Sequence, residues 1–168
     1  DILINNAGTS DPKRFKDLSE ESWNYVLETN LNGAFRVAKM ATDLMLKHKK
    51  GGSIINIASI LGQRVGLNLA SYATSKSALI QLTKSMALEL ARSNIRVNAL
   101  APGYILTEIN DDFFATDEGR DYINKIPMNR LGFEKDLDGA LLLLCSDASS
   151  FMTGSVINID GGHLINPL

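Results

Sequence analysis

Tyr72 and Lys76 stand four residues apart in the stretch SYATSKSAL. On a helix this spacing places both side chains on one face, with their Cβ atoms about 5–6 Å apart. A free tyrosine has a pKa of about 10, and an ammonium about 5 Å away stabilises the phenolate by roughly 3 kcal/mol, or about two pKa units. Such a phenol can serve as a general acid or base. The alternative is a half-buried tyrosine beside a solvated lysine.

Ser59 lies thirteen residues before Tyr72 and directly follows the apolar run IINIA. An apolar run of this length, ended by a polar residue, predicts a buried strand. Because the helix that carries Tyr72 and Lys76 comes next, the three side chains are predicted to reach one crevice. There the Ser59 hydroxyl would hold the same substrate oxygen that Tyr72 protonates.

Strands and helices are predicted to alternate along the rest of the chain. Predicted strands cover residues 2–4, 54–58, 95–100 and 155–159, and predicted helices run from Glu20 to the Gly51-Gly52 pair, over 71–92 and over 134–146. This order is typical of an α/β fold with a doubly wound parallel sheet. Ligands bind outside the carboxyl ends of such strands. We therefore expect Asn5-Asn6-Ala7-Gly8, Ser59 and Pro102-Gly103 to converge.

Composition narrows the functional classes. With 168 residues, 45% hydrophobic and 21% charged, the chain is expected to form one globular domain. A net charge of −2 gives no basic footprint for nucleic acid, and the apolar runs are too short for a membrane span. Its one cysteine, Cys145, excludes an internal disulfide and a cysteine-based metal site. We expect no metal, a cytoplasmic location, and His48 and His163 at the surface.

Six sequence motifs together resemble the classical short-chain dehydrogenase/reductase family, which includes 3-oxoacyl-carrier-protein reductases and sugar and polyol dehydrogenases. They are Asn5-Asn6-Ala7-Gly8, Asn30 in ETNLNGAF, Ser59 in NIASILG, the Tyr72/Lys76 pair, VNALAPGYILTE and MTGSVINIDGG. The resemblance covers nearly the whole chain in the family's order. It implies a Rossmann-like fold and an NAD(P)-dependent oxidoreductase that interconverts a carbonyl and a secondary alcohol. It also implies NAD or NADP as cofactor, a small-molecule substrate and a homodimer or homotetramer built on the two long helices.

The same resemblance assigns roles to individual residues. Tyr72 would be the proton donor or base, with Ser59 holding the substrate oxygen. Lys76 would lower the Tyr72 pKa and bind the nicotinamide ribose, and Asn30 would kink its helix and hold a water of the proton relay. The implied cofactor-binding residues are Asn6, Ala7, Gly8, Tyr72, Lys76, Pro102, Gly103, Ile105 and Thr107. Residues 104–127 resemble the family's variable substrate-covering loop, whereas Asn5, Asn56 and Asn98 are interpreted as structural.

One family feature lies outside these 168 residues. No G-x-x-x-G-x-G turn follows a predicted strand, although this turn seats the cofactor pyrophosphate at a helix N-terminus. We therefore expect residues 1–168 to be the C-terminal part of a single domain, starting at the family's fourth strand and lacking its first three βα units. The strand at 2–4 would then be a central one. Alternatives are a truncated, non-catalytic interaction module, a 3-oxoacyl-carrier-protein reductase specifically, and a nucleotide-sugar epimerase.

Overall fold

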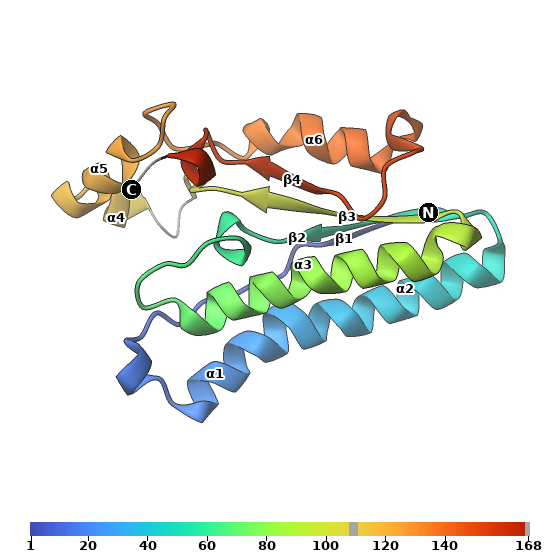
Figure 1. The fold of residues 1–168 in the computed structure, drawn as a ribbon, viewed down its shortest axis with the longest axis horizontal. Helices are drawn as coiled ribbons and strands as arrows, with labels where there is room; N and C mark the ends of the chain where they lie inside the picture. Colours follow the sequence, from blue (N-terminus) through green and yellow to red (C-terminus); the bar gives the residue numbers. More distant parts are fainter. Residues whose placement is uncertain (108–110, 167–168) are drawn as a thin grey trace.

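The four strands form one parallel sheet in the order β1-β2-β3-β4. They are β1 (Ile2–Asn5), β2 (Gly52–Ile57), β3 (Ile95–Pro102) and β4 (Val156–Ile159). This computed structural model describes residues 1–107 and 111–166. Figure 1 shows the sheet between two layers of helices. The predicted α/β fold with a doubly wound parallel sheet is confirmed, and each predicted strand is present within a few residues of its expected bounds.

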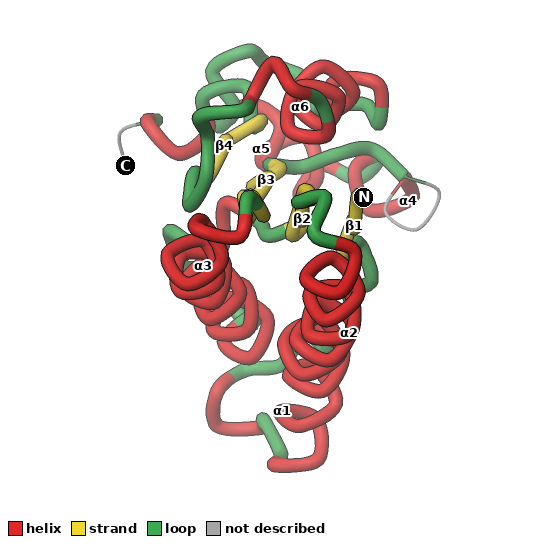
Figure 2. The backbone as a smooth tube through the Cα atoms, turned by 90° about the vertical axis from the view of Figure 1, so that its right-hand side faces the viewer, coloured by secondary structure: helices red, strands yellow, loops and turns green. Residues whose placement is uncertain are grey.

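Helices cover both faces of the sheet. The α-helices are α1 (Glu20–Leu27), α2 (Ala34–His48), α3 (Ala70–Leu90), α4 (Asp111–Phe114), α5 (Asp117–Asn124) and α6 (Lys135–Cys145). Short 3-10 helices cover Phe15–Asp17, Ile60–Gly62, Ala91–Ser93, Asp147–Ser149 and His163–Ile165. In Figure 2, α2 and α3 lie side by side against one face and α6 covers the other. No helix within the described ranges is long and apolar enough to cross a membrane.

The first long helix is interrupted where the sequence suggested a kink. Ser19 caps α1 by accepting a hydrogen bond from the Ser22 backbone N–H. Between α1 and α2 the chain forms a π-helix over Glu28–Gly33, and this segment contains Asn30. A π-bulge widens a helix by one residue per turn and is common at functional sites. The predicted single helix is therefore α1, a π-helix and α2 in succession.

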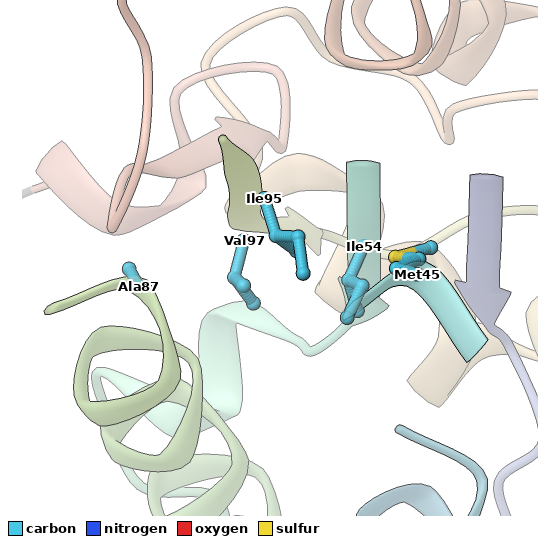
Figure 3. Packing of buried hydrophobic residues seen from close by; sticks show 5 residues of the cluster. All are labelled: Met45, Ile54, Ala87, Ile95 and Val97. Carbon is cyan, nitrogen blue, oxygen red and sulfur yellow. The ribbon is translucent and has the colours of Figure 1, made fainter. Parts of the chain in front are cut away.

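The sheet core joins α2, β2, α3 and β3. Figure 3 shows Met45 of α2 and Ala87 of α3 packed against the apolar side chains of the two central strands, Ile54, Ile95 and Val97. These side chains are almost fully buried. On the opposite face, α6 packs Leu144 against Ile55 and Leu100. Because β2 and β3 are covered on both faces, adjacent apolar residues such as Ile54 and Ile55, or Ala99 and Leu100, are buried on opposite sides of the sheet.

Strand β1 has a neighbouring strand on one side only among the described residues. In the described structure it pairs with β2 alone and forms an edge of the sheet. Helix α6 packs against β2, β3 and β4. The side chains of Ile2 and Ile4, which alternate with Leu3, remain 52% and 41% exposed. An apolar edge of this kind is a ready template for further strand pairing.

Buried amides connect the strands to the helices. The Asn5 amide donates to the Ala34 carbonyl at 3.2 Å and to Oδ1 of Asn56 at 2.9 Å, and the Asn56 amide donates to Oγ1 of Thr83 at 2.8 Å. Asn98 donates to the Met152 carbonyl at 2.9 Å. The structural interpretation of Asn5, Asn56 and Asn98 is thus confirmed.

Candidate active site

A cleft opens where the carboxyl ends of the first three strands meet. It has a volume of about 630 Å³ and contains Ser59, Tyr72 and Lys76 together with the segments that follow β1 and β3. The predicted convergence is therefore confirmed. Its lining residues are Asn6, Gly8, Thr9, Ser10, Ile57, Ala58, Ser59, Ile60, Leu61, Leu69, Tyr72, Lys76, Pro102, Gly103, Tyr104 and Thr107.

Tyr72 and Ser59 both line this cleft, and the Ser59 hydroxyl lies near enough to the phenol to affect its pKa. Tyr72 lies in the first turn of α3, while Ser59 follows β2 and caps the next 3-10 helix by accepting from the Leu61 N–H at 3.1 Å. Burial raises the pKa of Tyr72, and the Ser59 hydroxyl opposes that rise. Both hydroxyl-bearing residues therefore line the same cleft, and the raised pKa keeps the phenol protonated at neutral pH.

Lys76 is placed differently from the simple pair that the spacing predicted. Its side chain is only 3% exposed, and its ammonium donates to the Ile57 carbonyl at 2.8 Å while lying 5.7 Å from the centre of the Tyr72 ring. Burial lowers the pKa of Lys76 to about 8. The prediction of a shared helix face is correct. The expected lowering of the Tyr72 pKa by Lys76 is not supported, because burial raises the Tyr72 pKa and the Lys76 ammonium is directed to the Ile57 carbonyl.

Asn30 connects three parts of the site. It is completely buried in the π-helix. Its Oδ1 accepts from the Thr9 N–H at 2.7 Å, and its amide donates to the Thr9 carbonyl at 2.9 Å and to Oγ of Ser75 at 3.0 Å. Ser75 in turn donates to the Tyr72 carbonyl at 2.7 Å. Asn30 thereby fixes the loop after β1 against the helix turn that carries Tyr72.

Gly8 allows the loop after β1 to lie against this network. A Cβ atom at this position would stand 3.3 Å from Nζ of Lys76 and 3.6 Å from Oδ1 of Asn30. The distance to Lys76 is shorter than in most contacts that Cβ atoms make. The absence of a side chain therefore leaves the Lys76 ammonium accessible from the cleft. This explains physically why the turn ends in glycine.

The other predicted cofactor residues divide into two groups. Asn6, Pro102, Gly103 and Thr107 line the cleft together with Gly8. Ala7 and Ile105 are not among the lining residues. Ile105 forms a parallel bridge with Gly132 and lines a neighbouring hollow of about 210 Å³. Their side chains are directed elsewhere because alternate residues of an extended segment point to opposite sides.

Tyr104 and His163 were missed by the sequence analysis. Tyr104 lines the cleft directly after β3, and its ring packs against Phe114, Tyr122 and His163 at centroid distances of 5.7, 5.7 and 5.4 Å. The prediction that His163 is a surface residue is wrong, because it is 6% exposed; His48 is exposed as expected. Tyr104 could have been found from its position beside Pro102-Gly103. His163 carried no such signal.

The predicted substrate-covering segment, residues 104–127, is partly described. Residues 108–110 lie outside the described residues, and the remainder contains α4 and α5. Phe114, Ile126 and Leu131 form a small buried cluster with Tyr104, Leu106, Tyr122 and Ile123. The segment is thus more ordered than its polar, irregular sequence suggested.

The donors in the cleft fit a nicotinamide nucleotide. Lys76 presents an ammonium beside Gly8, where a side chain would obstruct it, and this is suitable for the hydroxyls of a ribose. Ser59 and Tyr72 hold their hydroxyls on the adjoining side. Across residues 1–107 and 111–166 no group of three His, Cys, Asp or Glu side chains comes together as a metal site.

Comparison with known proteins places these features among oxidoreductases. Residues 1–163 match the family model described as enoyl-(acyl carrier protein) reductase. The 3-oxoacyl-(acyl-carrier-protein) reductase FabG of Thermotoga maritima is 40% identical over 166 residues, which are 98% of this chain and 66% of that protein. The 2-dehydro-3-deoxy-D-gluconate 5-dehydrogenase of Bacillus subtilis is 43% identical over 166 residues, 98% of this chain and 65% of that protein.

Solved structures share the fold and hold cofactors. A gluconate 5-dehydrogenase of Burkholderia cenocepacia in complex with NADP and tartrate superposes with a TM-score of 0.93 at 35% identity, covering 97% of this chain and 64% of that one. A 4-hydroxyisoleucine dehydrogenase complexed with NADH superposes with a TM-score of 0.96 at 35% identity, covering 99% and 69%. The present chain thus spans slightly less than two thirds of the curated relatives that it matches.

Proposed function

Because the chain belongs to the short-chain dehydrogenase/reductase family, we propose that it is part of an NAD(P)-dependent oxidoreductase that interconverts a carbonyl and a secondary alcohol. The observation that carries this proposal is the meeting of Ser59, Tyr72 and Lys76 in one cleft beyond the strand ends. The matching relatives carry the names of dehydrogenases and reductases. NAD or NADP is the proposed cofactor, and a small carbonyl or alcohol compound is the proposed substrate.

In this proposal Tyr72 moves the proton. During reduction its hydroxyl protonates the substrate oxygen, which the Ser59 hydroxyl holds in place, and during oxidation the phenolate removes that proton. The bound nicotinamide supplies or accepts the hydride. Burial keeps Tyr72 protonated, so it is prepared to act as the acid. Once the proton has left, the Ser59 hydroxyl favours the phenolate form.

Asn30 is the proposed positioning residue of this proton pathway. It contacts Thr9 and Ser75 instead of Tyr72 or Lys76 directly. Its hydrogen bonds therefore fix the backbone on which the reacting side chains stand. We also propose that Asn30 holds a water of a proton relay that runs behind Lys76. The Lys76 ammonium faces the cleft next to Gly8, which is compatible with such a relay.

The exposed edge of β1 supports a second part of the proposal, that residues 1–168 are the C-terminal part of a single Rossmann domain. Ile2 and Ile4, on the face opposite to Leu3 and α2, are apolar and exposed, as expected for a strand whose cover on that face belongs to a further part of the domain. The relatives extend well beyond the matched region. The first three βα units, with the glycine-rich turn, would complete the cofactor site at this edge.

The exposed apolar face of α2 supports assembly through the long helices. Val37, Met40 and Leu44 follow one another at helical spacing and are 47%, 69% and 57% exposed. A stripe of this kind marks a contact surface. We propose a homodimer or homotetramer in the cytoplasm, and propose that residues 104–127 cover the substrate.

The test uses the full-length protein with NADH and NADPH and a panel of ketones, oxo acids and 3-oxoacyl thioesters, monitored at the nicotinamide absorbance. We expect turnover for at least one compound. Tyr72→Phe should then lower kcat by about 10³- to 10⁴-fold, because it removes the proton donor, while cofactor affinity and melting temperature stay nearly unchanged. Wild-type turnover by Tyr72→Phe would refute the role of Tyr72. Absence of hydride transfer to the whole panel would favour the non-catalytic interaction module.

A further inference from the structure

A second hollow of about 170 Å³ adjoins the catalytic cleft. The two share Ile60, Leu61, Leu69 and Tyr104 as lining residues. Beyond this apolar boundary the second hollow is basic, since Arg64, Lys125 and His163 line it. A substrate whose oxygen lies between Ser59 and Tyr72 could therefore extend past Tyr104 into a positively charged compartment.

Arg64 is held in place at one side of this hollow. Its guanidinium donates to the His163 carbonyl at 2.9 Å, which joins the loop after β2 to the segment after β4. The side chain is half-buried, and no carboxylate lies within ion-pair distance of it in the described part of the chain. A guanidinium offers five N–H donors in a planar fork that matches a carboxylate. The single backbone contact uses only part of this capacity.

Lys125 provides a second positive charge from the opposite side. It follows α5, and its ammonium lies over the Tyr122 ring at 5.2 Å from the ring centre. The Lys125 backbone carbonyl accepts from the Asn166 amide at 2.8 Å, which fastens this part of the segment to the end of the described chain. As with Arg64, none of the ion pairs in residues 1–107 and 111–166 involves Lys125.

No acidic side chain among the described residues lines the hollow to balance these charges. The closest acid to influence His163 is Asp160, and its carboxylate accepts from the Gly162 and Leu164 N–H groups at 2.9 and 2.8 Å. Burial and the positive charge of Arg64 lower the pKa of His163. Its buried Nδ1 has no hydrogen-bond partner among the described residues. The hollow therefore offers two cations and an additional neutral polar group.

We propose that Arg64 and Lys125 bind the carboxylate of the substrate, which makes hydroxy acids and oxo acids the substrate class. This inference rests on the proposed oxidoreductase function and deepens it. The carbonyl or hydroxyl of the acid would lie at Ser59 and Tyr72, and its carboxylate would lie beyond Tyr104. The competing class is a 3-oxoacyl thioester carried on a protein, which has no carboxylate to place there.

Tartrate binding to the full-length protein, saturated with NADP and measured by calorimetry, tests the anion site directly. Threitol, which replaces both carboxylates by alcohols, is the uncharged counterpart. We expect Arg64→Met to raise the tartrate Kd by about 10- to 100-fold, the range for a lost charge-assisted hydrogen bond, and Lys125→Met to raise it by about 3- to 10-fold. Arg64→Lys should restore part of the affinity.

Lys135→Met is the matched control. Lys135 is likewise an exposed lysine over an aromatic ring, 5.6 Å from the centre of Phe133, but it lines a different hollow. This variant should leave the tartrate Kd within twofold. Because Arg64 also joins two segments, the folding of its variants is checked by their melting temperature. Lys125 is exposed, so its replacement should not disturb folding and provides an independent test. Wild-type protein that binds threitol as tightly as tartrate, or an unchanged Kd in both variants, would overturn the proposal.

Kinetics separate this inference from the function on which it rests. Turnover of an acetoacetyl thioester with a KM unaffected by Arg64→Met and Lys125→Met would leave the oxidoreductase proposal intact and overturn the acid substrate class. Arg64-dependent tartrate binding without hydride transfer to any carbonyl would support the anion site and refute the oxidoreductase. If the oxidoreductase function and the acid substrate class are both correct, the Arg64 and Lys125 variants should raise KM for an oxo acid. They should change kcat by less than about threefold, since neither residue lies at the reacting atoms.

Discussion

Two walls of the same cleft are stabilised differently, one by hydrogen bonds between distant segments and the other by apolar packing within one segment. The first, called here the α3 wall, consists of Asn30, Ser59, Tyr72 and Lys76 and is held together by buried and part-buried hydrogen bonds between distant segments. The second, called here the aromatic wall, is the described part of residues 104–131. The hydrophobic residues that pack on its buried cluster of Phe114, Ile126 and Leu131 all come from the same segment.

The difference concerns how far each wall depends on the rest of the molecule. Every hydrogen bond of Asn30 spans at least 21 residues of sequence, so the α3 wall cannot loosen without disturbing β1, the π-helix and α3. The aromatic wall contacts the remainder through the Tyr104–His163 ring contact and through backbone groups, including the Met128-to-Gly161 and Asn166-to-Lys125 hydrogen bonds. The groups proposed to move protons thus lie on the globally fixed wall, whereas the locally closed wall, proposed to cover the substrate, is expected to open more easily.

Replacing Asn30 in the α3 wall should have the largest effect on the free energy of unfolding. Asn30→Ala leaves the Thr9 N–H, the Thr9 carbonyl and the Ser75 hydroxyl without this buried partner, and we expect the free energy of unfolding to fall by about 3 kcal/mol. Urea denaturation of the full-length protein measures it. Asn32→Ala is the control, since Asn32 lies in the same π-helix but is exposed and contacts Glu28. That change should cost less than about 0.5 kcal/mol; equal losses in both variants would contradict the comparison.

Lys76 should make the stability of the protein depend on pH, and this dependence should be absent from the Lys76→Met variant. Burial lowers the pKa of Lys76 to about 8, whereas an unfolded lysine has a pKa of about 10.4. Between these values the unfolded chain binds more protons, so stability rises with pH in this window and the benefit is lost as the pH falls through 8. We expect wild type to gain about 2 kcal/mol relative to Lys76→Met between pH 7 and 10. Parallel stability curves of the two proteins would contradict this.

The aromatic wall should show the smallest global effect. Leu131→Ala removes a buried side chain, yet we expect it to lower the global free energy of unfolding by less than about 1 kcal/mol, because this segment can open by itself. Its amide hydrogens should exchange faster. Leu79→Ala in α3, where the side chain is 1% exposed, is the contrasting variant and should cost about 3 kcal/mol. A comparable global loss for Leu131→Ala would show that the two walls unfold together.

Sequence patterns predicted the elements of the α3 wall well. Continuous apolar runs located β2 and β3, and the strand–helix order placed Ser59 and Tyr72 at one edge of the sheet. The spacing of Tyr72 and Lys76 predicted a shared helix face but not the direction of the ammonium. That direction depends on the Ile57 carbonyl, which lies 19 residues away and leaves no mark in the local pattern.

The aromatic wall was much less predictable. Its residues come from short helices and turns, where polar composition hides a small cluster such as Phe114 and Leu131. The burial of His163 likewise arises from a contact with Tyr104 across 59 residues. Local periodicity carries no information on such contacts. The Arg64–His163 connection, on which the acid-binding proposal depends, is equally invisible without the fold.

The Asn5–Asn56 amide pair has a consequence for the alignment of the sheet. Strands β1 and β2 are apolar on both sides of their backbones, so hydrophobic burial alone hardly distinguishes the observed pairing from one shifted by a residue. In the observed register Asn5 stands opposite Asn56, and the two amides bond at 2.9 Å. A shift of one residue would place Asn5 against Ile55 or Ile57 and leave polar atoms unpaired in the core, at a cost of roughly 1–3 kcal/mol each. These two asparagines thus act as an alignment mark, because they favour one register of β1 against β2 over registers that hydrophobic burial alone would allow.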